Sequence, residues 1–253
     1  MLAMNRIHWV RGVSMVLVAL VGVIVLAGCE EPQMAAMKAV DPAFTPKLLL
    51  PPLPDTCNTP DGMTLDDKTG VVYLCCPNFN DQKYPGIVMK ITPDNKISKF
   101  TDLPALPETK KVGPMGLDIG PDGNLYVADN QYFFDKNRKS RLLRVKVKAG
   151  KADGVEIAAD GFSLSNAVIW RGNDVFVSDT FSEVEGQSYI YRIPMDEMKK
   201  GVVHLKPGDK DPHIIATLKT IKRGRGDMAG ADGMTFDGEG NLYCGNFGDG
   251  RIF

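Results

Sequence analysis

Three side chains with oxygen donors occupy the same position of a repeated phrase in this 253-residue sequence. Asp61, Asn166 and Asp232 each open a copy of the phrase, and Gly113 stands at the corresponding place in another copy. Strands are usually depleted in Asp and Asn, so their recurrence at one register is notable. Carboxylate and amide oxygens suit Ca²⁺ or Mg²⁺, whereas simple turn chemistry at a strand entry is the alternative interpretation.

The repeated phrase is the first part of a longer unit that returns about every fifty residues. Its copies occupy residues 61–66, 113–118, 166–171 and 232–237. Each is followed by a turn and by further short apolar runs, with an aromatic at one shared place: Tyr73, Tyr126, Phe176 and Tyr243. Short runs of this kind predict a four-stranded meander, and repeated meanders are typical of propeller blades. The sequence therefore predicts an all-β fold, a β-propeller of four-stranded blades over residues 57–253.

The opening residues of the phrases acquire a common location in such a fold. The first strand of each blade lines the central channel of a propeller, so equivalent positions converge on the axis. We therefore predict that Asp61, Asn166 and Asp232 lie together and bind a divalent cation. We interpret Asp66 and Asp118, like Asp237 in the last copy, as turn formers only.

The length of the repeat region bears on how many blades are present. The sequence ends at Phe253, within the third run of the fourth unit, although a propeller must close to remove its sheet edges. We therefore expect about four blades here, with the propeller incomplete at the C-terminus and six-bladed when complete. The charged segment at residues 195–211 is read as a loop inserted at a blade edge.

The first residues of the chain have the composition of an export signal. Arg6 and Arg11 precede an apolar run at residues 13–27, and small residues lead to Cys29. The run is short for a membrane-spanning helix, which is the alternative and needs about 20 residues. The segment resembles bacterial lipoprotein signals. That resemblance implies a signal peptide at 1–28, lipidation of Cys29, a Pro-rich tether over 29–56, and attachment to the cell envelope facing the periplasm or exterior.

Export would place the remaining cysteines in an oxidising compartment. Cys57, Cys75, Cys76 and Cys244 allow three pairings, and separately packed thiols are an equally simple interpretation.

Several other functions are disfavoured by the composition. The 30 Lys and Arg residues nearly balance 31 Asp and Glu, and no basic stretch with aromatics predicts a nucleic-acid partner. No GxGxxG or GxxxxGK[ST] phosphate loop occurs. A Ser-His-Asp triad needs a histidine, and beyond the signal only His204 and His213 are present, both near the charged insertion.

Three stretches of the chain resemble the regucalcin, gluconolactonase and luciferin-regenerating-enzyme family. They are residues 232–243, residues 165–167 and residues 121–129, and the resemblance extends over roughly 57–253. It implies a six-bladed propeller with one divalent cation in the channel, Ca²⁺ in the first place and Zn²⁺ or Mg²⁺ otherwise. It also implies that many members hydrolyse lactones.

The same resemblance implies roles for individual residues. Asp232 matches a metal ligand that is also the proposed acid/base, and Asn166 matches a second ligand. Asp61 stands where the family usually has Glu, which is one methylene longer. The expected function is metal-dependent hydrolysis of lactones or sugar-derived esters, in which a water attacks with Asp232 as general base. Gly113, which begins a stretch without polar side chains, leaves a non-catalytic ligand- or protein-binding propeller as the alternative.

Overall fold

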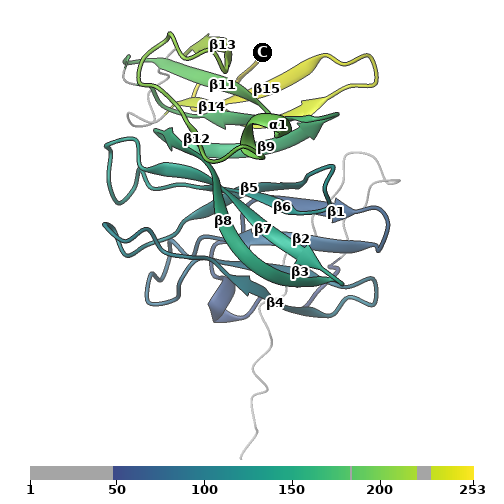
Figure 1. Ribbon diagram of the computed structural model, residues 1–253. Coiled ribbons are helices and arrows are strands. Elements are labelled where there is room, and N and C mark those ends of the chain that lie inside the picture. The colour runs from purple at the N-terminus through teal and green to yellow at the C-terminus, as the bar shows by residue number, and fades with distance from the viewer. Residues whose placement is uncertain (1–47, 183, 221–228) are drawn as a thin grey trace, which may run out of the picture. The chain divides into compact units, whose positions relative to one another are not determined.

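Each repeat unit folds into its own antiparallel sheet (Figure 1), in a computed structural model that describes residues 48–182, 184–220 and 229–253. The first sheet contains β1 (Met63–Asp66), β2 (Val71–Cys76), β3 (Ile87–Ile91) and β4 (Ile97–Asp102). The second contains β5 (Pro114–Ile119), β6 (Leu125–Asp129), β7 (Ser140–Lys148) and β8 (Lys151–Phe162). The third contains β9 (Ser165–Arg171), β10 (Asp174–Asp179), β11 (Gln187–Pro194) and β13 (Ile214–Lys219). The fourth contains β14 (Gly230–Phe236), β15 (Leu242–Phe247) and β16 (Arg251–Ile252).

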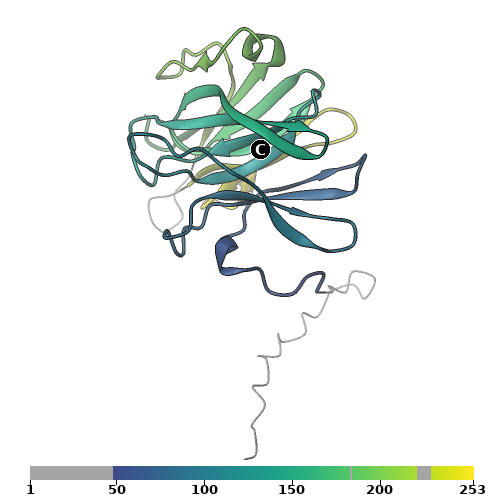
Figure 2. The same cartoon turned by 60° about the horizontal axis from the view of Figure 1, so that its bottom comes forward.

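The first strands of successive sheets are neighbours, as the propeller prediction requires. β1 contacts β5, β5 contacts β9, and β9 contacts β14. Figures 1 and 2 show the sheets following one another in chain order, from the blue first sheet to the yellow fourth. A Cβ added to Gly116 of β5 would lie 2.5 Å from the carbonyl oxygen of Asn166 in β9. Only glycine fits there, so the innermost strands can approach closely. The prediction of an all-β propeller with four blades is confirmed.

The hydrophobic core lies between consecutive sheets. The recurring aromatics contribute to it: Tyr126 packs edge-on against Trp170 of the third sheet, and Phe176 packs against Phe236 of the fourth. Tyr73 lies in the cluster that joins the first two sheets. Because a single sheet cannot cover its own faces, these contacts between sheets are what make the repeats mutually stabilising.

The charged insertion was predicted to be a loop at a blade edge; it does lie at the edge of the second sheet, but it is not only a loop. It contains a short helix, α1 (Met195–Met198), and β12 (Val203–His204), which pairs in parallel with β8. β12 thereby adds a fifth strand to the second sheet. Val203 and Leu205 are buried there, so two apolar residues within a charged segment determine where it packs.

The cysteines divide into one disulfide and two thiols. Cys57 and Cys76 are bonded, with 5.2 Å between their Cα atoms, and tie a 3₁₀ turn (Asp55–Cys57) to the end of β2. Cys75 and Cys244 are buried free thiols. The predicted signal peptide at 1–28, the predicted lipidation site Cys29 and most of the predicted tether lie outside the described residues. Over the part of the chain that the structure describes, no helix combines the length and apolar character needed to cross a bilayer.

Candidate functional site

The opening residues of the phrases stand where the innermost strands begin. Asp61 lies two residues before the first residue of β1, and its backbone N–H donates to the carbonyl of Cys75 near the end of β2. Asn166 is the second residue of β9, and Asp232 is the third residue of β14. Asp61 is exposed, Asp232 is half-buried and Asn166 is nearly fully buried. The three side chains therefore differ in depth, with Asp61 nearest the mouth of the channel and Asn166 buried in its wall.

Electrostatic coupling links the aspartates of the first and fourth blades. Burial raises the pKa of Asp61, and the negative charge of Asp232 raises it further, against a lowering hydrogen bond from Gly62. Burial also raises the pKa of Asp232, while hydrogen bonds from the Asn166 side chain and the Gly233 backbone lower it. The coupling thus relates Asp232 to both Asp61 and Asn166, which stand at the start of innermost strands in the first and third blades.

The third and fourth blades hold Asn166 and Asp232 through hydroxyl groups. The amide nitrogen of Asn166 donates to Thr180 Oγ1 at 3.2 Å, and that hydroxyl donates to the carbonyl of Ala231 at 2.7 Å. Ser178 Oγ donates to the carbonyl of Asp232 at 2.9 Å. Because both hydroxyls end on backbone carbonyls of β14, they join the third blade to β14 beside Asn166 and Asp232.

Gly113 contributes no ligand, and its surroundings explain why a side chain is absent. A Cβ at this position would lie 2.7 Å from the carbonyl oxygen of Asn130 and 3.2 Å from Cζ of Phe79. The backbone N–H of Gly113 donates to Asp129 Oδ1 at 2.8 Å, which holds the chain in this close approach. At this place the ring of Phe79 from the first blade and the Asn130 backbone of the second blade stand where the other blades present a polar side chain.

The donor set of Asp61, Asn166 and Asp232 fits a hard divalent cation. Two carboxylates with raised pKa values mark negative charge that protein groups leave uncompensated, and an amide oxygen is a further hard donor. Within the described residues no group of three or more His, Cys, Asp or Glu side chains gathers to form a richer site. Waters or a substrate oxygen would have to complete the coordination.

Asp118 was predicted to be a turn former, and that prediction is wrong. Asp66 and Asp237 do accept hydrogen bonds from the turns that follow them. Asp118 instead accepts from Thr64 Oγ1 in the first sheet and from the backbone N–H of Trp170 in the third. The sequence held a signal for this difference, since Ile119 continues the strand after Asp118 and the turn residues come later.

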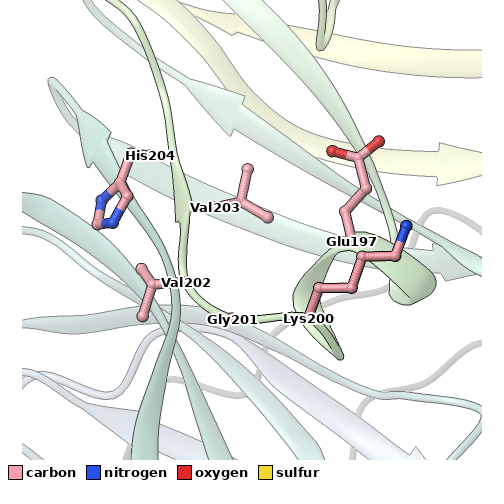
Figure 3. Close-up of a pocket in the computed structure, with 6 residues that line it drawn as sticks. All are labelled: Glu197, Lys200, Gly201, Val202, Val203 and His204. Atoms are coloured by element: carbon pink, nitrogen blue, oxygen red, sulfur yellow. The ribbon is translucent and has the colours of Figure 1, made fainter.

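Two surface hollows lie away from these three residues. One, of about 540 Å³, is formed by Glu197 and residues 200–204 of the insertion (Figure 3). The other, of about 220 Å³, lies between loops of the first two blades and is lined by Phe134, among others. His213, which lies two residues after the charged insertion, bonds Asp211 and Glu197 through its two ring nitrogens. A histidine engaged in this way has no nitrogen left to activate a serine.

Comparison with known proteins identifies the family. Residues 86–253 match the family described as SMP-30/Gluconolactonase/LRE-like region, and the chain belongs to that family. The family includes lactonase hydrolases, and its members often bind divalent cations. Asn166 and Asp232 lie within the matched region, whereas Asp61 precedes it.

Solved structures show the same fold at low sequence identity. A gluconolactonase from Xanthomonas campestris superposes with a TM-score of 0.52 at 15% identity, over 78% of this chain and 56% of that chain. A protein described as a candidate gluconolactonase gives a TM-score of 0.51 at 15% identity, over 78% and 57%. This chain thus spans a little over half the length of these structures. No curated protein sequence matches it.

Proposed function

We propose that this protein is a divalent-metal-dependent hydrolase of lactones or related esters. The observation that carries the proposal is that Asp61, Asn166 and Asp232 stand at the start of three innermost strands, and the coupling of Asp232 to Asp61 and Asn166 supports it. Membership of a family that includes lactonases supports the reaction class. Ca²⁺ is the cation that the oxygen donors suit best, with Zn²⁺ or Mg²⁺ as alternatives.

In this proposal each of the three residues has a separate role in ester hydrolysis. Asp232 accepts the proton of the attacking water, because its carboxylate is the half-buried base among the three. Asn166 orients Asp232 through the side-chain hydrogen bond between them. Asp61 adds a second negative charge at the mouth of the channel. A bound cation would supply polarisation of the lactone carbonyl and stabilisation of the oxyanion.

The test compares two aspartate variants of the full-length protein in a lactone panel, with and without EDTA and added Ca²⁺ or Zn²⁺. Asp232→Asn should lower kcat/KM by at least about a hundredfold, the usual contribution of a general base. Asp153→Asn is the matched control, because Asp153 is exposed on the outer strand β8. Calorimetry of Ca²⁺ binding gives a second readout. Full activity in Asp232→Asn would exclude this role, and absence of both cation binding and hydrolysis would favour the non-catalytic alternative.

We also infer that the protein is anchored in the cell envelope through Cys29. The arginines, apolar run and small residues before Cys29 support this inference. Fractionation of cells that express the full-length protein should find it with membranes, and Cys29→Ser should release it from them. If both forms were equally soluble, the anchor would be excluded without affecting the proposed reaction.

A further inference from the structure

An aromatic residue stands at or shortly after the end of the second strand of every sheet. Phe79, Tyr132 and Phe181 lie in the loop that leads to the third strand, whereas Phe247 is the last residue of β15. The second strand runs antiparallel to the innermost strand, so its end lies beside the start of that strand, as the hydrogen bond from Asn130 N–H to the Gly113 carbonyl shows. The aromatic loops therefore lie at the same end of the channel as Asp61 and Asp232.

Rings from three blades form a continuous band, which we call the aromatic rim: Phe79, Phe133, Tyr132 and Phe181. The ring centroids of Phe79 and Phe133 lie 5.2 Å apart, and those of Phe133 and Tyr132 lie 6.4 Å apart. Tyr132 then contacts Phe181 at 4.7 Å. The band begins against Gly113, where Phe79 touches the innermost strand, and ends beside Thr180, which bonds Asn166.

The rim keeps apolar surface in contact with solvent. Phe133 is 44% exposed, and the other three rings are only half-buried. A contiguous apolar patch at the entrance of a site marks a place where a ligand covers it, since burying apolar area stabilises by about 25 cal/mol per Å².

Two polar side chains beside the rim are occupied by the protein itself. The Asn78 amide bonds Asn58, Thr56 and Pro85, and the Gln131 amide bonds Thr109, Lys111 and Asp129. A polyhydroxylated ligand would need several open donors and acceptors here, because specificity for hydroxyl groups comes from side chains that pair with them.

One hydrogen-bond donor beside the rim, the amide nitrogen of Asn130, has no partner among the described residues. Asn130 accepts a hydrogen bond on Oδ1 from the Tyr132 N–H at 2.9 Å, which fixes the orientation of its amide. Its Nδ2 is buried and has no hydrogen-bond partner among the described residues. A buried donor without a partner costs about 1–3 kcal/mol, which an oxygen atom of a ligand would recover. Asn130 adjoins Gly113, so the second blade offers this amide in place of a side chain in the phrase itself.

We propose that the aromatic rim and Asn130 form the substrate subsite, and that the substrates are lactones with an aryl or alkyl substituent rather than polyhydroxylated sugar lactones. This inference rests on the proposed lactone hydrolysis. The apolar substituent packs on the rim, and an oxygen of the ester group accepts the Asn130 Nδ2 hydrogen bond.

The experiment measures kcat/KM of the full-length protein for dihydrocoumarin and for glucono-δ-lactone, each divided by its uncatalysed rate. We expect a preference for dihydrocoumarin of at least about tenfold, which Phe133→Ala lowers by roughly tenfold. Tyr243→Ala is the matched control, because Tyr243 is 43% exposed but lies in the middle of β15, outside the rim. Asn130→Ala should lower kcat/KM for both lactones and leave their ratio unchanged.

The ratio is measured on one sample, so a fraction of misfolded variant cancels. A preference for glucono-δ-lactone, or a ratio that Phe133→Ala leaves unchanged, would overturn the subsite while the proposed hydrolase stands. If neither lactone is hydrolysed, the proposed function fails, and equilibrium dialysis with dihydrocoumarin tests the rim by itself. Binding that Phe133→Ala weakens would then support the subsite, and absence of binding would overturn it.

Discussion

The carboxylate of Asp118 accepts a hydrogen bond of 2.8 Å from the backbone N–H of Trp170, which belongs to the next blade. Its other oxygen accepts a bond of 2.9 Å from Thr64 Oγ1 in the preceding blade. One side chain thus joins the innermost strands of three blades, near the end of β5 that is opposite the mouth at which the candidate site lies. The spacing of Asp61 and Asn166 depends on how those strands are held.

Asp118→Ala should therefore destabilise the protein by about 1–3 kcal/mol, because it leaves two polar groups without their partner. Urea unfolding followed by fluorescence measures this change. Asp66→Ala is the matched control, since Asp66 has the same place in the first phrase but bonds only its own exposed turn. Equal losses in the two variants would show that the bridge between blades contributes nothing.

A second prediction concerns the buried ion pair of Arg141 and Asp129. Arg141 Nε donates to Asp129 Oδ2 at 2.7 Å, and both side chains are almost inaccessible to solvent. Arg141→Met should lower the free energy of unfolding by about 3–5 kcal/mol, because it leaves a buried carboxylate without its counter-charge. Arg192→Met, which breaks the exposed pair with Asp174, should cost at most about 1 kcal/mol. The prediction fails if chemical denaturation gives similar values for both.

The disulfide provides a third prediction. Cys76 is the last residue of β2, the same place that Asp129 has in β6 and Asp179 has in β10. Each of these aspartates accepts hydrogen bonds from backbone N–H groups just before the first strand of its own blade. Cys57–Cys76 performs the same task covalently. Its loop spans 19 residues, so its removal should cost about 3 kcal/mol.

Thermal melts with and without reductant measure this cost. Reduction should lower the Tm of the native protein and leave the Tm of a Cys57→Ala/Cys76→Ala variant unchanged. A native protein insensitive to reductant under conditions that reduce accessible disulfides, with four titratable thiols in residues 48–253, would show that the bond is not formed.

The fourth prediction is that His213, which lies two residues after the charged insertion, makes the stability of the protein depend on pH. Burial lowers the pKa of His213, but its bonds to Glu197 and Asp211 outweigh this effect and raise the pKa above the ordinary 6.5. The protonated form is therefore favoured in the folded protein. The stability that this protonated form contributes is fully present below about pH 6.5, and it is lost as the pH rises through the raised pKa of His213.

Melting curves across that range should show a Tm that falls by a few degrees as the pH rises. His213→Gln should remove this component, whereas His204→Gln should retain it, because His204 is exposed and bonds only Asp160. A pH profile that is the same in His213→Gln as in the native protein would contradict the assignment.

Much of the fold and of the candidate site could be predicted from the sequence, because both depend on local patterns. Alternating apolar runs with turns between them specify each strand, and the repeat specifies that the sheets are equivalent. Equivalence places the first residue of every phrase at one depth. The location of Asp61, Asn166 and Asp232 therefore follows from counting along the chain.

What only the tertiary structure decided involves contacts between segments that are distant in sequence. Asp66 and Asp118 occupy the same place in their phrases, yet one closes a turn and the other joins three blades. The pairing of Cys57 with Cys76, the docking of β12 on β8 and the ring of Phe79 against Gly113 are of the same kind. Each depends on which surfaces meet when the sheets pack, and a local pattern of residue types does not specify that geometry.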